Sequence, residues 1–158
     1  GFVSHQRGIG SGGTPMIHYR GADIHKALAG LADEGGDPYE GITLRFVNPA
    51  NGAPVFPTLA YAAQLLRPGE ATRGKRETAS TMYTVIEGSG ATEIAGKRFE
   101  WEKNDIFVVP NFLWRRHFNT GAGDAVLYSV SDAPLMEKVG QYRAQGRLAD
   151  GTVENLVA

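Results

Sequence analysis

Cysteine is absent from the 158 residues, and this absence excludes disulfide bonds, thiolate zinc sites and cysteine nucleophiles. Any bound metal would therefore need histidine, carboxylate or water ligands. A surplus of one charge is also missing, because 16 lysine and arginine residues balance 17 aspartate and glutamate residues to a net charge of −1. Since binding to a phosphate backbone requires a basic surplus, we expect no nucleic-acid partner.

Long apolar segments are missing as well. No run approaches the ~20 residues of a membrane span, and the chain does not start with a basic segment followed by an apolar stretch. We therefore expect a cytoplasmic protein with no membrane partner and no signal peptide. With 42% hydrophobic residues, the chain is long enough for one domain with its own core.

Glycine is abundant, at 21 residues together with eight prolines, and this predicts many turns. The glycine-rich residues 1–18 are predicted to be a linker or inter-domain segment. Within residues 19–37, Ile24, Leu28 and Leu31 recur at helical spacing, which predicts an inter-domain helix.

From residue 38 the apolar residues recur with a period of two, which predicts β-strands. Eight short strands with turn signals between them are expected at residues 42–47, 59–66, 82–87, 91–94, 97–101, 106–109, 114–118 and 126–130. Glycines at the strand ends and Pro110 after a strand fit the sharp transitions of a small jelly-roll barrel. The run 62–66 is mainly apolar, and in a protein with two such barrels it would be a docking face.

The residues after the last strand predict a helix and a tail. Pro134 suits a first helical turn, Tyr142 lies on the apolar face, and Gly146 ends the helix. We therefore place the barrel and its carboxy-terminal helix at residues 38–145, and a poorly ordered tail at residues 146–158.

Two stretches of the sequence resemble the two cupin motifs. The first motif is G, five residues, H-x-H, three or four residues, E, six residues, G. Its positions fall here on Gly69, Lys75, Glu77, Thr81 and Gly88, so the spacing is kept and every metal ligand is replaced. The second motif falls on Asn104, Pro110, Phe112, Arg115 and Asn119, and Arg115 stands where its histidine is expected.

The wider match, over about residues 19–143, resembles the bicupin ring-cleaving dioxygenases, which include gentisate, salicylate and 1-hydroxy-2-naphthoate dioxygenases. The segments that carry the resemblance are residues 49–52, 57–59, 65–70, 85–90, 104–110 and 129–134. The resemblance implies a mainly β chain with a single cupin, a jelly-roll barrel, and one short helix before and one after it. It also implies a parent reaction in which Fe(II) and O2 cleave the ring of gentisate or a related hydroxylated aromatic acid. In that family the amino-terminal cupin holds Fe(II) on three histidines, and this chain is similar to the carboxy-terminal cupin.

If the strands keep the cupin register, Lys75, Glu77 and Arg115 converge at the barrel mouth. Iron that activates O2 needs neutral imidazoles, sometimes with a carboxylate, so the two cations do not serve. Glu77 alone would supply one ligand where mononuclear catalytic sites ordinarily use three. Thr81 occupies the position of the motif's glutamate. We therefore predict no metal, no cofactor and no catalytic residue in this domain.

Three arrangements of these motif residues stay open: ion pairs on a solvated rim, a buried structural cluster, or a small-anion site with net charge +1. His117 lies two residues beyond the expected ligand position. It is either a half-buried, hydrogen-bonded strand residue, or a donor or general base that contacts a ligand.

The favoured function is structural: a metal-free domain, inactive alone, that packs on the amino-terminal cupin of the same protein and contributes to a homo-oligomer. One alternative is a module that binds a small aromatic acid or another anion at the degenerate mouth. The second alternative is a metal-independent single-cupin isomerase that uses Glu77 and His117 as an acid–base pair.

Overall fold

The computed structural model describes residues 18–157. The predicted linker at residues 1–18 therefore lies outside the described residues, except for His18. The described part contains two helices, α1 (Gly21–Gly30) and α2 (Ala133–Lys138). Its strands are β1 (Ile42–Phe46), β2 (Ala60–Leu66), β3 (Lys75–Glu77), β4 (Thr81–Glu87), β5 (Ser89–Ile94), β6 (Lys97–Glu102), β7 (Ile106–Val109), β8 (Arg115–Asn119), β9 (Ala125–Ser131), β10 (Ala144–Arg147) and β11 (Val153–Asn155).

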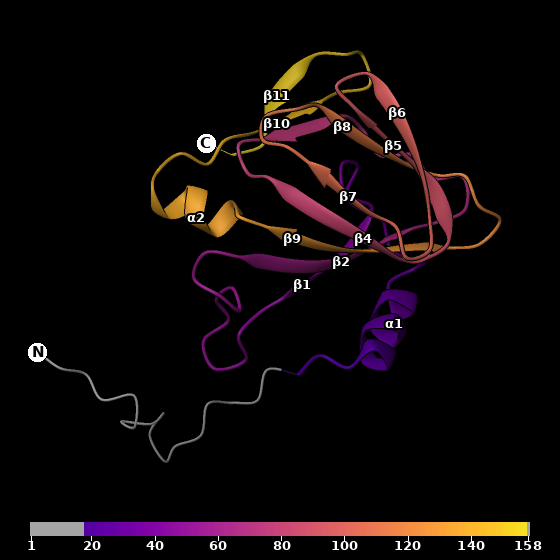
Figure 1. Ribbon diagram of the computed structural model, residues 1–158, viewed down its shortest axis with the longest axis horizontal. Helices are drawn as coiled ribbons and strands as arrows, with labels where there is room; N and C mark the ends of the chain where they lie inside the picture. The colour runs from indigo at the N-terminus through magenta and orange to yellow at the C-terminus, as the bar shows by residue number, and fades with distance from the viewer. Residues whose placement is uncertain (1–17, 158) are drawn as a thin grey trace, which may run out of the picture.

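The strands form two antiparallel sheets that face each other (Figure 1). The five-stranded sheet has the order β1-β2-β9-β4-β7, and the six-stranded sheet has the order β11-β10-β3-β8-β5-β6. The core between the sheets contains Leu66, Val85, Ile94, Trp101 and Leu127. The predicted jelly-roll barrel with few helices is confirmed.

Strand periodicity decides which side chains enter the barrel. On β8, Arg115, His117 and Asn119 are buried, whereas Arg116 between them is exposed. On β4, Tyr83 and its alternate neighbours are likewise buried. Because successive side chains point to opposite faces, a shift of one residue would exchange these two sets. The register therefore places Arg115 and His117 on the inner face together.

Helix α1 covers part of the outer face of the five-stranded sheet (Figure 1). Leu28 of this helix is buried in a cluster with Ile42, Leu65 and Val126. The apolar run 62–66 is therefore not an open docking face, and its residues 63–66 are buried. No helix within residues 18–157 has the length and apolar character needed to cross a bilayer.

The carboxy-terminal part differs from the prediction. Helix α2 ends at Lys138 instead of continuing to Gly146, and Gly140 follows it with φ of +69°. The chain then forms β10, which pairs with β3, and β11, which pairs with β10, so the predicted tail contains a strand. Tertiary contacts override the helical pattern here, since Tyr142 is drawn to the site described below.

Gly146 in β10 has a packing role that explains why it need not end a helix. A Cβ atom at this position would lie 2.3 Å from Cζ of Tyr39. The Tyr39 ring therefore packs directly on the backbone of β10, and its hydroxyl donates a hydrogen bond to Glu154 Oε1 over 2.7 Å. Only glycine allows so close an approach of a ring to a strand.

Candidate functional site

Lys75, Glu77 and Arg115 lie together at the mouth of the barrel. Lys75 on β3 is paired directly with Arg115 on β8, and Glu77 follows on the same face of β3. Lys75 Nζ lies 3.3 Å from Glu77 Oε2, and Arg115 Nη2 lies 3.6 Å from Glu77 Oε1. The structure thus brings together the three charged residues that the motif spacing singled out.

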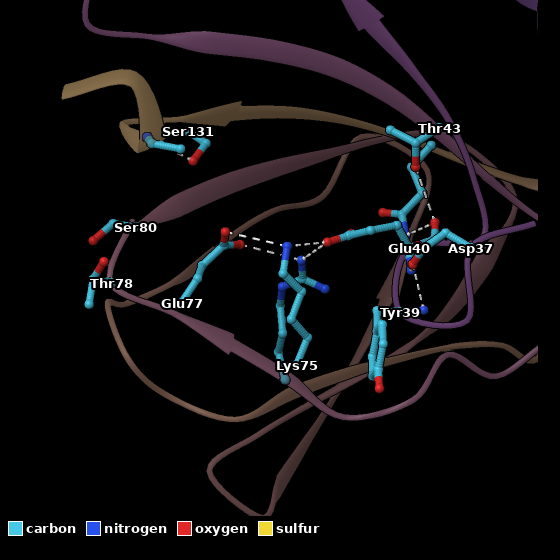
Figure 2. Close-up of polar contacts among 12 residues, drawn as sticks. Asp37, Tyr39, Glu40, Thr43, Lys75, Glu77, Thr78, Ser80 and Ser131 are labelled. Carbon is cyan, nitrogen blue, oxygen red and sulfur yellow. Dashed lines mark hydrogen bonds and ion pairs between the residues drawn. The ribbon is translucent and has the colours of Figure 1, made fainter. Parts of the chain in front are cut away.

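A fourth charged residue, Glu40, completes this group, which we call the ion cluster. Glu40 Oε1 is 2.7 Å from Lys75 Nζ and 2.6 Å from Arg115 Nη2. Figure 2 shows the Lys75 amine between the carboxylates of Glu40 and Glu77. The cluster therefore has two cations and two anions, and its formal charge is zero instead of +1.

Glu40 reaches the mouth from a turn that precedes β1. Asp37 Oδ1 accepts the backbone N–H groups of Tyr39 and Glu40 over 2.7 and 3.0 Å, which fixes the turn. Gln64 Nε2 on β2 donates to the Glu40 carbonyl oxygen over 2.6 Å. Sequence analysis missed Glu40, which belongs to no motif. The signal available was indirect: two cations facing one carboxylate in a barrel call for a second anion.

The ion cluster is largely withdrawn from solvent. The side chain of Arg115 is 3% exposed, that of Glu77 11% and that of Lys75 14%. Burial alone would raise the pKa of Glu40, but the positive charges of Arg115 and Lys75 outweigh it and lower this pKa to about 2. For Arg115 burial lowers the pKa, and the charges of Glu40 and Glu77 raise it above its usual value. Both groups stay charged at neutral pH.

The ion cluster borders a cavity of about 380 Å³. Tyr142, from the segment between α2 and β10, donates a hydrogen bond to Glu77 Oε2 over 2.6 Å. Thr81, at the fourth motif position, is buried on β4 and lines the same cavity with Tyr83. The Arg115 guanidinium lies 5.7 Å from the centre of the Tyr83 ring. The motif residues therefore do not splay into solvent along a rim.

His117 is fully buried and belongs to a separate hydrogen-bond chain. Its Nδ1 lies 2.8 Å from Thr92 Oγ1, which also accepts the Trp101 indole N–H over 2.9 Å. Its backbone N–H donates to Thr72 Oγ1. Within residues 18–157, Nε2 has no hydrogen-bond partner, and no ion pair or hydrogen bond joins His117 to Glu77. Burial and the nearby charge of Arg115 lower the pKa of His117 to about 3, so the ring is neutral.

The donor set does not fit a mononuclear iron. Two of the motif positions hold cations, and both carboxylates are engaged by those cations. Among residues 18–157, His117 is the single imidazole beside them, and its Nδ1 already contacts Thr92. Across the described residues, no group of three histidine or acidic side chains could hold a metal ion. Catalytic metal sites ordinarily use three protein ligands, and the residues at this mouth do not supply them.

Comparison with known proteins identifies relatives of this chain. Residues 63–131 match the family model for a cupin domain. The chain is 43% identical over 139 residues to a 5-aminosalicylate 1,2-dioxygenase from a Comamonas species. It is 36% identical over 140 residues to gentisate 1,2-dioxygenase 1 of Aquipseudomonas alcaligenes. Its fold matches the crystal structure of salicylate 1,2-dioxygenase from Pseudoaminobacter salicylatoxidans with a TM-score of 0.74 and 34% identity. The chain therefore contains a cupin domain, and the relatives that match it are gentisate-type ring-cleaving dioxygenases.

The chain corresponds to part of these family members. Each of the two sequence matches covers 87% of this chain but only 37% and 39% of the respective relative. The structural match covers 81% of this chain and 36% of the salicylate dioxygenase chain. The chain therefore spans somewhat more than a third of the length of the family members that it matches.

The ion cluster predicts a large cost for removing one of its anions. Glu77→Ala leaves Lys75 and Arg115 short of a buried counter-charge, so the free energy of unfolding should fall by about 3–5 kcal/mol. Glu100→Ala is the matched control, because Glu100 pairs with Arg98 on the surface, and it should cost less than about 1 kcal/mol. Urea denaturation at neutral pH measures both. Equal, small effects of the two substitutions would contradict a buried cluster.

The buried neutral His117 predicts a loss of stability on acidification. Because its pKa is about 3 in the folded protein, below the ordinary value of 6.5, the folded state binds fewer protons than the unfolded state. Stability should therefore fall as the pH drops from about 6.5 toward 3. Between pH 6.5 and 5, His117→Gln should reduce this slope by up to about 1.4 kcal/mol per pH unit. Denaturant melts at several pH values measure the slope, and identical slopes would refute the prediction.

Proposed function

We propose that this chain is the carboxy-terminal cupin of a gentisate-type ring-cleaving dioxygenase. In this proposal the domain holds no iron of its own. It braces another cupin of the same protein, which carries Fe(II) and opens the ring of gentisate or a related hydroxylated aromatic acid with O2. The observation that carries the proposal is the ion cluster at the motif positions where other cupins hold their metal.

The charges at the barrel mouth support a structural role. Lys75 and Arg115 repel a divalent cation, and each is neutralised by carboxylates of the same chain. The ion cluster instead joins three segments: the turn before β1, strand β3 and strand β8. A buried ion cluster of this kind holds such segments in one arrangement, even where it adds little net stability.

An exposed apolar surface supports the proposal that this domain packs against another domain or subunit. We call it the β4–β7 face, and it consists of Met82, Ile86, Ile106 and Val108 on the outer side of the five-stranded sheet. Ile106 is 63% exposed and Val108 is 53% exposed. Contiguous exposed apolar side chains of this kind mark interaction surfaces. We propose that the β4–β7 face packs against the iron-bearing cupin or another subunit of a homo-oligomer.

The other functions considered have less support. The ion cluster has no net positive charge to attract an aromatic carboxylate, which weakens the case for an anion-binding mouth. For the isomerase, Glu77 and His117 would have to act on one substrate. Glu77 is held by Tyr142 and Lys75, whereas His117 contacts Thr92 on another strand. No contact in the described structure pairs them as acid and base.

Iron analysis tests the metal-free assignment. After anaerobic loading with Fe(II) and desalting, the chain should retain far less than one iron per molecule, because its mouth offers cations where ligands are needed. The loaded chain should also form no ring-opened product from gentisate, as followed by ultraviolet absorbance. Retention of about one iron per chain, lost in Glu77→Ala, would overturn the assignment.

Charge insertion tests the packing role. The test is made in the longer protein of which this chain is proposed to be one domain. There, Ile106→Lys with Val108→Lys should lower both the assembled mass and the rate of ring cleavage, because lysine resists burial in an apolar interface. Glu102→Lys, at an exposed position of β6, is the control and should change neither. Light scattering and turnover of gentisate provide the two measurements. Unchanged mass and turnover in the double variant would exclude the β4–β7 face as the contact.

A further inference from the structure

A second cavity lies outside the barrel, on the outer face of the six-stranded sheet. Its volume is about 610 Å³, and it lies between the turn that joins β5 to β6 and the turn that joins β10 to β11. Gly96 and Gly151 of these turns line its sides, and Gly74, Trp114 and Arg116 contribute to its lining. We call it the arginine cavity.

Arginine dominates the charge of this cavity. Four arginines and one carboxylate, that of Glu93, line it. Arg115 is neutralised within the ion cluster, so the other three, Arg73, Arg116 and Arg147, leave two positive charges unbalanced. Within residues 18–157, none of these three arginines forms an ion pair. Glu93 lies opposite Arg116 in the β5–β8 register, yet the two side chains are not in ion-pair contact.

Two of the arginines are held in place by contacts that leave their terminal nitrogens without an acceptor in the described part of the chain. Arg116 Nε donates to the Thr72 carbonyl oxygen over 2.7 Å, and its guanidinium stacks 4.7 Å from the centre of the Phe118 ring. The Arg147 guanidinium lies 4.3 Å from the centre of the Trp114 ring. Stacking restrains these side chains before any ligand arrives, which lowers the entropy cost of binding.

The Trp114 ring also contacts a second arginine, Arg76. Arg76 lies 4.6 Å from the centre of the Trp114 ring, and its Nε and Nη2 both donate to Gln145 Oε1, over 2.9 and 2.7 Å. Trp114 is therefore fixed by groups on β3 and β10, and it fixes Arg147 in turn. Contacts within the chain therefore hold the side chains of this cavity wall in place before a ligand binds.

We propose that the arginine cavity binds a small oxyanion with two negative charges, free in solution, of the dicarboxylate or phosphate type. Guanidinium groups match the geometry of carboxylate and phosphate oxygens and form charge-assisted hydrogen bonds with them. The volume lies within the range of about 300–1,000 Å³ that is usual for small-molecule sites. Two unbalanced positive charges match a dianion. Arg115 lines both this cavity and the barrel mouth, but its charge is balanced within the ion cluster, so anion binding here does not depend on the proposed metal-free role.

Nuclear magnetic resonance of the full 158-residue chain can detect this binding at an identified place. Sodium phosphate and sodium malonate are titrated separately, with sodium chloride at equal ionic strength as the reference. The two tryptophans form an internal comparison, since Trp114 lines the cavity and Trp101 is buried in the core. We expect saturable shifts of the Trp114 indole N–H and of the Gly74 and Gly96 amides, with the Trp101 indole unchanged. Saturation by one of the two anions alone assigns the site to that class.

Substitutions identify the residues that bind. Arg147→Gln and Arg116→Gln should each raise the dissociation constant by about tenfold or more, because each removes charge-assisted hydrogen bonds. Arg98→Gln is the matched control, since Arg98 lies on the same sheet but pairs with Glu100, and it should change the constant by less than about twofold.

Three results would overturn the proposal. The first is shifts that chloride reproduces at equal ionic strength. The second is equal weakening in Arg98→Gln. The third is a change in the mass of the protein in Arg147→Gln, measured by light scattering, with no saturable anion binding. That last result would show a contact between copies instead of a ligand site.

Discussion

The contact of one carboxylate oxygen with two cations determines the polar half of this barrel. Lys75 and Arg115 both lie against Oε1 of Glu40, and they come from strands that pair directly with one another. Two like charges in a medium of low dielectric repel strongly, so this register is tenable only with anions between them. Glu40 and Glu77 provide those anions from a turn and from β3. The strand register at the mouth therefore requires the charges there to balance.

The interior of the barrel has an apolar part and a charged part. On one side lie apolar residues such as Val85, Leu127 and Trp101, and on the other lies the ion cluster. His117 stands between them, kept neutral by burial and by the charge of Arg115, with Trp101 and Thr92 in its hydrogen-bond chain. This histidine, two residues beyond the motif position that Arg115 occupies, lies between the core and the charged mouth. We propose that the scaffold is a structural element here, because its ligand positions have changed.

Much of this arrangement could be predicted from the sequence, for identifiable reasons. Alternation of apolar residues located eight strands, distributed over both sheets. Motif spacing placed Lys75, Glu77 and Arg115 at one point, because strand pairing converts spacing into proximity. Glu40 escaped prediction because it lies in a turn, 35 residues before Lys75, where no periodicity links the two. Strands β3, β10 and β11 escaped because these segments of three or four residues are too short and too polar to show apolar alternation. The pattern also identified 62–66 as apolar, but could not show that α1 would cover it.

Tyr39 and Gly146 connect the position of the Glu40 carboxylate to a strand that is distant in the sequence. The ring of Tyr39 packs on a strand backbone that has no room for a side chain, and the next residue is Glu40. Any larger residue at position 146 would push the ring outward and carry the adjoining carboxylate away from Lys75 and Arg115. An evolutionary change in one glycine near the end of the chain would therefore alter the electrostatics of a site built by residues 40 to 115. Inheritance of this glycine and of Glu40 should be coupled, since Gly146 also lies opposite Lys75 in the pairing of β10 with β3.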